Sequence, residues 1–253
     1  MRFFITGGGH GIGRNAAEEL LDRGHEVVVF DIEEEYLDEL PEEVETHEGD
    51  VYDRERVAEV LDTEEFDVLV NCAGYQRQGP VEEMDMDKVE RHFETNLFGM
   101  VNMIQESLPM LRERSGKIVN VSSVAGKESG PFWGLYSASK HGVEAMSDAL
   151  RMEVERFDVD VVVVEPGGVR TGFNERGREN LENYLETVYG DWCRERLDQP
   201  LGGMSPDKAG EKLADIAEKR SGQRYSIGWD GFFITRLAKF VPGRIKDFIA
   251  KRF

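Results

Sequence analysis

The stretch that decides the fold is "RFFITGGGHGIGRNAAEELL", residues 2–21. An apolar run of strand length leads directly into a glycine-rich loop, 6–13, and then into helical periodicity. Gly7, Gly11 and Gly13 permit a tight turn and let the backbone approach a pyrophosphate, while the following helix N-terminus offers free N–H groups and a positive dipole end. Between a strand and a helix, this glycine spacing indicates a dinucleotide cradle more than a plain turn.

The same alternation of apolar runs and helical periodicity continues along the chain. We expect strands at 3–6, 26–30, 44–49, 66–71, 117–123, 159–166 and 224–228, and helices at 12–24, 33–39, 53–63, 86–113, 135–157 and 206–220. Runs rich in valine and isoleucine mark strands buried on both faces of a parallel sheet. The sequence therefore predicts an α/β protein: one doubly wound Rossmann domain over 1–253, with a mostly or fully parallel seven-stranded sheet.

Composition narrows the class of protein. A length of 253 residues with 40% apolar content suits one α/β domain with a full-sized core. There is no run of about 18 apolar residues that would span a bilayer. Met1 leads almost at once into the glycine loop and leaves no room for a secretory signal, so we expect a cytoplasmic protein. We interpret Cys72 and Cys193 as reduced thiols and the five scattered histidines as ordinary residues, with no metal site.

The chain is strongly acidic. Its formal charge is −20, from 51 acidic and 31 basic residues. This balance argues against a nucleic-acid-binding surface, because a phosphate backbone demands positive charge. Acidic runs such as "DIEEEYLDELPEEVETHEGD", 31–50, are tolerated in concentrated salt, where charges are screened within about 3 Å at 1 M. The profile is typical of a halophilic protein, the alternative being an ordinary acidic soluble protein.

Asp31 ends the second expected strand. A carboxylate there accepts hydrogen bonds from the adenosine ribose hydroxyls and repels a 2′-phosphate. The next residues are Ile32 and Glu33, and the basic groups nearby are His10 and Arg14. We therefore favour NAD(H) over NADP(H). Asp31 could equally serve as the N-cap of the helix expected at 33–39.

A second informative stretch is "GLYSASKHG", 134–142. It places Tyr136 and Lys140 one helical turn apart on the same face. Free tyrosine and lysine have pKa values of roughly 10 and 10.4, too high for acid–base work near neutrality. A cation close to Tyr136 is expected to lower its pKa by about one to three units and bring it into a working range. The alternative is an ordinary helix start with serines as polar filler.

Together these motifs resemble the short-chain dehydrogenase/reductase family of the conventional type over almost the whole chain. The resemblance extends to "NCAG", 71–74, to Asn96 in "FETNLFG", to "NVSS", 120–123, and to "PGGVRT", 166–171. Ser123 precedes Tyr136 by the spacing common in the family. Cys72 departs from the family's NNAG segment. The resemblance implies catalytic residues Asn96, Ser123, Tyr136 and Lys140, and a cofactor site formed by Thr6, Gly7, Gly9, His10, Gly11, Ile12, Gly13, Asp31, Asp50, Val51, Asn71, Ala73, Gly74, Tyr136, Lys140, Pro166, Gly167, Val169 and Thr171.

The resemblance also implies a role for each catalytic residue. Tyr136 exchanges a proton with the substrate hydroxyl or carbonyl oxygen, and Ser123 hydrogen-bonds that same oxygen. Lys140 binds the nicotinamide ribose, and Asn96 holds a water that relays protons from Lys140. The reaction needs no metal. Family members commonly form homodimers or homotetramers through the long helices, here 86–113 and 135–157, and we expect the same.

The substrate is less well defined by sequence. In this family the segment corresponding to 172–204 is a substrate lid, and here it carries apolar residues at helical spacing. We expect an apolar wall and an apolar alcohol or ketone, similar to a steroid, retinol or lipid, contacted by Phe132, Trp133, Tyr184, Val188 and Trp192. The alternatives are a sugar or polyol dehydrogenase, and a regulator that binds NAD(H) without reacting.

The last stretch, 229–253, is the one clearly basic region and predicts an amphipathic extension. It could pack over the pocket mouth or a subunit interface, lie on an acidic membrane surface, or be disordered.

Overall fold

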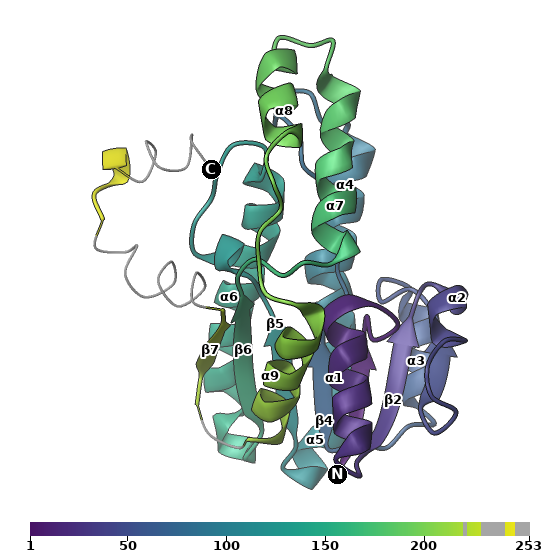
Figure 1. Cartoon of the computed structure of the whole chain (residues 1–253). Coiled ribbons are helices and arrows are strands. Elements are labelled where there is room, and N and C mark those ends of the chain that lie inside the picture. The colour runs from purple at the N-terminus through teal and green to yellow at the C-terminus, as the bar shows by residue number, and fades with distance from the viewer. Residues whose placement is uncertain (220–221, 229–240, 246–253) are drawn as a thin grey trace.

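The computed structural model describes residues 1–219, 222–228 and 241–245 (Figure 1). At its centre is one seven-stranded, fully parallel sheet in the order β3-β2-β1-β4-β5-β6-β7. The strands are β1 (Arg2–Thr6), β2 (Glu26–Asp31), β3 (Glu45–Glu48), β4 (Val68–Asn71), β5 (Lys117–Val121), β6 (Asp160–Pro166) and β7 (Arg224–Ile227). The predicted doubly wound Rossmann fold is confirmed.

The strand order reverses next to β1. β1 pairs with β2 on one side and with β4 on the other, so that Thr6 lies between Phe30 and Asn71 at the carboxyl ends. The two halves of the sheet wind away from this point, which leaves a crevice beyond those ends where ligands of such folds bind. The glycine loop that follows β1 lies at this crevice.

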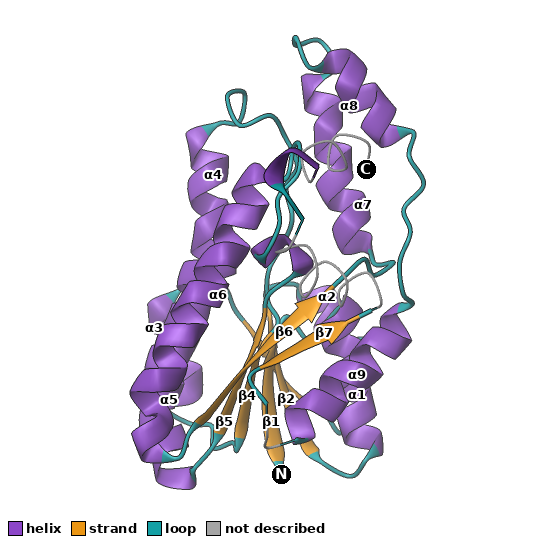
Figure 2. Ribbon diagram, turned by 90° about the vertical axis from the view of Figure 1, so that its left-hand side faces the viewer, coloured by secondary structure: helices purple, strands orange, loops and turns teal. Residues whose placement is uncertain are grey.

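Helices cover both faces of the sheet (Figure 2). The strand period of two sends Phe3 and Ile5 to one face and Phe4 to the other. Phe3 and Ile5 join the core under α1 and α9, and Phe4 joins the core under α3, α5 and α6. The bounds of the helices in these layers are α1 (Gly11–Asp22), α2 (Glu34–Leu37), α3 (Arg54–Leu61), α4 (Met86–Phe93), α5 (Met100–Arg114), α6 (Gly134–Val154) and α9 (Pro206–Glu218).

The long helix expected at 86–113 is not a uniform α-helix. A π-helical segment, Glu94–Gly99, separates α4 from α5. Such segments insert extra residues into a helix and occur frequently at functional sites. Gly99 ends the segment against α3's N-terminal loop, where an added Cβ would lie 2.4 Å from a methyl carbon of Val51. Asn96, predicted to be catalytic, lies within this segment.

Residues 172–204 stand beyond the carboxyl edge of the sheet, at the top of Figure 1. They form α7 (Gly172–Glu179), a 3₁₀ turn (Asn180–Tyr184) and α8 (Gly190–Leu197). The extension predicted at 229–253 falls on residues that, apart from 241–245, lie outside the described part of the chain. Within the described residues, none of the helices is both long and apolar enough to cross a membrane.

Candidate active site

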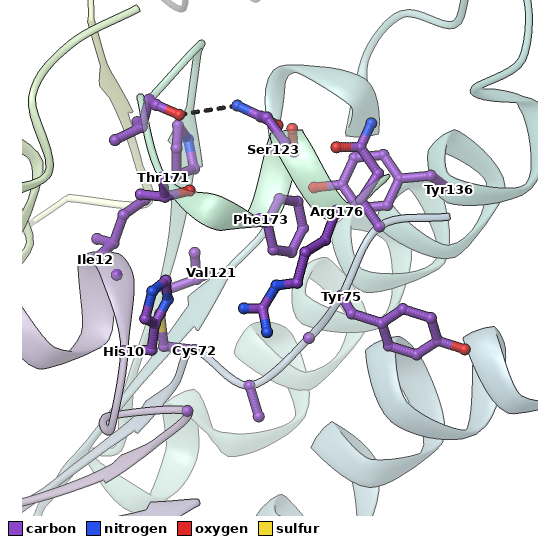
Figure 3. A pocket seen from close by; sticks show the side chains of 18 of the residues that line it. His10, Ile12, Cys72, Tyr75, Val121, Ser123, Tyr136, Thr171, Phe173 and Arg176 are labelled. Carbon is purple, nitrogen blue, oxygen red and sulfur yellow. Dashed lines mark hydrogen bonds between the residues drawn. The ribbon is translucent and has the colours of Figure 1, made fainter. Parts of the chain in front are cut away.

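A cavity of about 800 Å³ opens at the carboxyl ends of the central strands (Figure 3). Its size falls within the range of ligand pockets, which is roughly 300–1,000 Å³. Most of the predicted cofactor residues line it, namely Gly7, His10, Gly11, Ile12, Gly13, Asp31, Asp50, Val51, Ala73, Gly74, Tyr136, Lys140, Pro166, Gly167, Val169 and Thr171. The tertiary structure thus gathers motifs from the whole length of the sequence around one space.

Two glycines have no room for a side chain. Gly7 has φ +67°, and a Cβ there would lie 2.6 Å from the Cα of Ala73. A Cβ on Gly13 would lie 2.2 Å from the Gly7 carbonyl oxygen. Thr6 does not line the cavity; its Oγ1 accepts hydrogen bonds from the backbone N–H groups of Cys72 and Ala73, both at 3.2 Å. Thr6 therefore shapes the cradle by joining the ends of β1 and β4.

Asp31 holds the glycine loop in place. Its Oδ2 accepts a hydrogen bond from the Gly9 N–H at 2.9 Å, and its Oδ1 accepts one from the Glu33 N–H at 3.2 Å. Gly9 acts through this bond and does not line the cavity. The N-cap residue of α2 is Glu33, so the alternative N-cap role for Asp31 is not realised directly.

The two basic residues near Asp31 differ in position. The Arg14 guanidinium is bound by Glu18 at 2.9 Å and by Glu39 at 2.6 Å, and Arg14 does not line the cavity. The His10 ring does line it and packs on the Tyr36 ring at 5.0 Å between centroids. Arg14 is thus already neutralised by carboxylates and is not placed to receive a 2′-phosphate.

Two further predicted cofactor residues have structural partners. Asp50 lines the cavity, and its carboxylate accepts a hydrogen bond from Arg91. Asn71 is buried and does not line the cavity; its Nδ2 donates to Oδ1 of Asn120 at 2.9 Å. Asn71 therefore links β4 to β5. Its predicted contact with the cofactor stays a prediction.

Ser123, Tyr136 and Lys140 meet at the same cavity wall, where Figure 3 shows Ser123 and Tyr136. Ser123 follows β5, and its Oγ accepts a hydrogen bond from the Ala125 N–H at 3.1 Å. Tyr136 and Lys140 lie one turn apart in the first half of α6. The Lys140 ammonium donates to the Val121 carbonyl oxygen at 3.0 Å, which anchors it at the end of β5.

The electrostatics of this wall differ from the sequence expectation. Burial raises the pKa of Tyr136 to about 12, and a hydrogen bond with Ser123 offsets part of that rise. Burial also lowers the pKa of Lys140 to about 8. The expected lowering of the Tyr136 pKa by Lys140 is not present in the protein alone. The Lys140 Nζ lies 6.0 Å from the Tyr136 ring centre, and removal of tyrosinate from water dominates at that distance.

Asn96 is fully buried and does not line the cavity. Its Nδ2 donates to the Tyr75 carbonyl oxygen at 2.8 Å, and its Oδ1 accepts from the Tyr75 N–H at 2.9 Å. The side chain thereby fixes the loop that follows β4. The water relay implied by the family resemblance stays a prediction.

Sequence reasoning missed two residues that contact Tyr136 and one further residue of the cavity wall. The Tyr136 ring contacts His92, 6.0 Å away and nearly parallel, and Phe173, 5.9 Å away and edge-on. Arg176, also on α7, lines the cavity and pairs with Glu33 at 3.5 Å (Figure 3). These contacts join segments distant in sequence, so no local pattern could have revealed them.

Of the five predicted substrate residues, Trp133 lines the cavity. Phe132 and Tyr184 are buried with Leu181 and Cys193 in a separate apolar cluster, against which Trp192 packs. Val188 is 89% exposed. The apolar stripe of 172–204 mainly holds the lid together, because helical periodicity identifies a buried face but not what it is buried against. The cavity wall near the lid instead carries Gln76, Arg77, Gln78, Phe173, Asn174, Arg178, Asn180, Arg196, Gln199 and Leu201.

One cluster of potential metal ligands lies away from the cavity. Glu45, His47 and Glu64 have ligand atoms within 4.8 Å of one another, although the sequence showed no metal-ligand spacing. Arg2 donates to both Glu45 and Glu64, and His47 contacts Glu64 at 2.9 Å. These partners already compensate the carboxylates, and we assign no metal there.

The cavity, its glycine loop and the wall of Ser123, Tyr136 and Lys140 agree with the comparison of sequences. The model of the family described as short chain dehydrogenase matches residues 2–182. The chain belongs to the short-chain dehydrogenase family. Its fold and its place among oxidoreductases follow from that membership, and the resemblance noted in the sequence is confirmed.

Several known proteins resemble this short-chain dehydrogenase. It is 36% identical to a 3-ketodihydrosphingosine reductase from Bacteroides thetaiotaomicron, with 86% of this chain and 83% of that protein covered. It is 32% identical to an NADPH-dependent 3-dehydrocapnine reductase from Ornithobacterium rhinotracheale, with 96% and 93% covered. The crystal structure of a short-chain dehydrogenase from Streptomyces avermitilis superposes with a TM-score of 0.76 at 28% identity, covering 92% of this chain and 90% of that one.

Proposed function

We propose that this short-chain dehydrogenase interconverts a secondary alcohol and a ketone with a nicotinamide dinucleotide, NAD(H) in preference to NADP(H). The single observation that carries the proposal is that Ser123, Tyr136 and Lys140 share one cavity with the glycine loop and Asp31. When bound, the nicotinamide supplies the hydride acceptor or donor. The residues described above would bind it, orient it and handle the proton.

The cradle fits a dinucleotide. Gly7 and Gly13 leave the backbone bare where a pyrophosphate approaches the N-terminus of α1, and an added Cβ at either position would clash. The Asp31 carboxylate lines the cavity beside this loop and is suited to accept from ribose hydroxyls. Lys140 points its ammonium into the same cavity wall, where it would hold a second ribose.

The proton is assigned to Tyr136. Because burial raises its pKa to about 12, the phenol is protonated at neutral pH in the protein alone. A protonated Tyr136 can donate to a carbonyl oxygen as a ketone is reduced, and Ser123 can donate a second hydrogen bond to that oxygen. Alcohol oxidation requires the opposite transfer, which a positive charge near Tyr136 would favour.

The substrate is proposed to have an apolar body. Trp133, Phe173 and Leu201 line the cavity, and the Phe173 ring contacts that of Tyr136. The relatives named for acting on 3-ketodihydrosphingosine and 3-dehydrocapnine support a reductase. A sugar or polyol is the second candidate, favoured by the amides of Gln76, Gln78, Asn174 and Asn180 on the same walls. Turnover of an apolar ketone but not of polyols would decide between them.

The cofactor proposal is tested by titrating the protein with NADH and with NADPH and following nicotinamide fluorescence. We expect tighter binding of NADH, because the Asp31 carboxylate repels a 2′-phosphate and Arg14 is already paired with glutamates. The Asp31→Asn variant should show a smaller difference between its affinities for NADH and NADPH, because the negative charge is removed. One relative is named as NADPH-dependent, so the two titrations also compare this chain with that relative. Tighter NADPH binding would overturn the NAD(H) preference, and failure of both to bind would overturn the proposed function.

A further inference from the structure

Two arginines of the lid stand out in this acidic protein. Arg178 on α7 and Arg196 on α8 both line the cavity. The surrounding sequence is rich in glutamate and aspartate, and most described arginines form ion pairs, including their helix neighbours Arg176 and Arg194. Within 1–219, 222–228 and 241–245, no carboxylate forms an ion pair with Arg178 or Arg196.

The pair is held in place by a neutral residue. Arg178 donates to the backbone carbonyl oxygen of Gln199, and Arg196 donates to the Gln199 side-chain oxygen at 3.1 Å. Burial, and then the nearby charge of Arg178, lower the pKa of Arg196 from its ordinary value. Two like charges are therefore kept close together without a counter-ion, an arrangement that costs free energy unless an anion binds there.

A second observation comes from the loop after β4, which packs against α7. Gln76 is 4% exposed and lines the same cavity, yet neither atom of its amide has a hydrogen-bond partner. The indole N–H of Trp133, another lining residue, is also buried without an acceptor. Buried polar groups are nearly always hydrogen-bonded, so the unmet N–H groups of these two lining residues indicate a missing acceptor.

The packing brings these groups to one place. Gly177 precedes Arg178, and a Cβ on Gly177 would lie 3.0 Å from the Gln76 side chain. The Gln78 N–H donates to the Gly177 carbonyl oxygen at 3.2 Å. The loop after β4 is thus fastened to α7 beside Arg178, on the lid side of the cavity.

We propose that Arg178, Arg196 and Gln76 form a site for an oxyanion on the substrate, such as a carboxylate or a phosphate. The proposal rests on the proposed function and makes it more specific: the substrate is an alcohol or ketone with an apolar body and an acidic group. Guanidinium forks match the geometry of carboxylate and phosphate oxygens, and hydrogen bonds to charged groups are stronger than those between neutral groups.

The test is a binding measurement that needs no turnover. Octanoate and octan-1-ol share an apolar chain and differ in the acidic group, and both are titrated by calorimetry against the wild type and the variants. The variants are Arg178→Gln, Arg196→Gln, the double variant, and Arg194→Gln as control. Arg194 lies on α8, as Arg196 does, but it pairs with Asp191 at 2.9 Å and does not line the cavity. All titrations use one KCl concentration at which circular dichroism shows every variant folded.

We expect the wild type and Arg194→Gln to bind octanoate about tenfold to a hundredfold more tightly than octan-1-ol, since charged hydrogen bonds are worth roughly 1.5–3 kcal/mol each. The double variant should lose this preference. Equal binding of the two ligands by the wild type, no octanoate binding, or a preference that survives in the double variant would each overturn the proposal.

A second measurement separates the acidic-substrate site from the cofactor site. The double variant should bind NADH as the wild type does, and Tyr136→Phe should keep the octanoate preference. If the double variant loses as much affinity for NADH as it loses for octanoate, the arginines bind the cofactor and the proposal is wrong. If octanoate binding follows the expectation while NADH does not bind the wild type, the proposed function fails on its own.

Discussion

Tyr136 is the residue whose chemistry depends most on its surroundings. It lies at the start of α6, is 6% exposed, and is enclosed by the rings of His92 and Phe173. Its hydroxyl is beside Ser123, so a substrate oxygen in the cavity can contact both. Burial raises the pKa of Tyr136 to about 12 and so keeps the phenol protonated at neutral pH.

For Tyr136→Phe we expect turnover to fall by at least ~100-fold, the usual scale for loss of a positioned acid or base. NADH affinity should change little, because the ring and its packing are kept. The measurement is steady-state turnover of an apolar ketone beside a fluorescence titration of NADH. Near-normal turnover in the variant would remove Tyr136 from the mechanism.

His92 is a buried titratable group next to the site. It is fully buried, and neither ring nitrogen makes a well-formed hydrogen bond. Burial lowers its pKa to about 4, from an ordinary value of about 6.5. Between these values the unfolded histidine binds a proton that the folded one does not, so stability is lost as the pH falls from about 6.5 toward about 4.

His92→Phe should therefore raise the melting temperature at pH 7 and reduce its loss in acid. A buried unsatisfied polar group costs about 1–3 kcal/mol, and phenylalanine keeps the stacking with Tyr75 and Tyr136. Melting curves of both proteins at pH 7, 6 and 5 make the comparison. A difference between the two proteins that stays constant or shrinks in acid would show that His92 finds a partner in solution.

At the scale of elements, the α1–α9 contact holds the cradle helix. Gly210 in α9 lies against α1, and a Cβ there would lie 2.3 Å from the Cβ of Asn15 and 2.8 Å from the backbone nitrogen of Ala16. Asn15 in turn donates to the Gly11 carbonyl oxygen at 2.7 Å. The close approach of the two helices thus supports the loop that receives the cofactor.

Gly210→Ala should lower the melting temperature and weaken NADH binding. Alanine has a higher helix propensity than glycine, which favours the variant by about 1 kcal/mol. Overpacking typically costs about 1–3 kcal/mol, and here the added Cβ meets backbone atoms that can move only if the two helices separate. We expect the overpacking cost to exceed the gain. Gly130→Ala is the control, since nothing lies within 4 Å of a Cβ there and Gly130 does not line the cavity. An unchanged melting temperature and an unchanged NADH affinity for Gly210→Ala would contradict a close contact between α1 and α9 at this position.

At the scale of the whole molecule, charge is the dominant property. A net charge of −20 favours expansion of the chain at low ionic strength. Ion pairs such as Arg23 with Asp215 and Arg224 with Asp148 relieve part of the repulsion. Exposed glutamates around α2, including Glu34, Glu35, Glu42 and Glu43, have no cation within ion-pair distance among the described residues.

The melting temperature should rise as KCl increases from 0.1 to 2 M, because the screening length falls from about 10 Å to below about 3 Å. Changing Glu34, Glu35, Glu42 and Glu43 together to glutamine should make this dependence shallower. Thermal melts at matched protein concentration measure how the melting temperature depends on KCl in the wild type and in the quadruple variant. A melting temperature that is flat or falls with salt would contradict a stability limited by charge repulsion.

The sequence by itself determined the parallel sheet, the glycine loop after β1, and the placement of Tyr136 and Lys140 one turn apart on one helix. Buried valine runs, the glycine loop of 6–13 and the one-turn spacing of Tyr136 and Lys140 are local patterns, and local sterics and periodicity are enough to read them. Even so, the spacing of Tyr136 and Lys140 did not reveal their pKa values, because burial depends on the whole surrounding wall.

Only the tertiary structure decided which side chains face the cavity. The apolar stripe of the lid packs on itself, whereas Arg178, Arg196 and Gln76 turn out to line the cavity. Helical periodicity separates a buried face from an exposed one but carries no information about the partner across a contact. The partner is set by the path of the chain between segments far apart in sequence, and the same long-range packing brings His92 and Phe173 into contact with Tyr136.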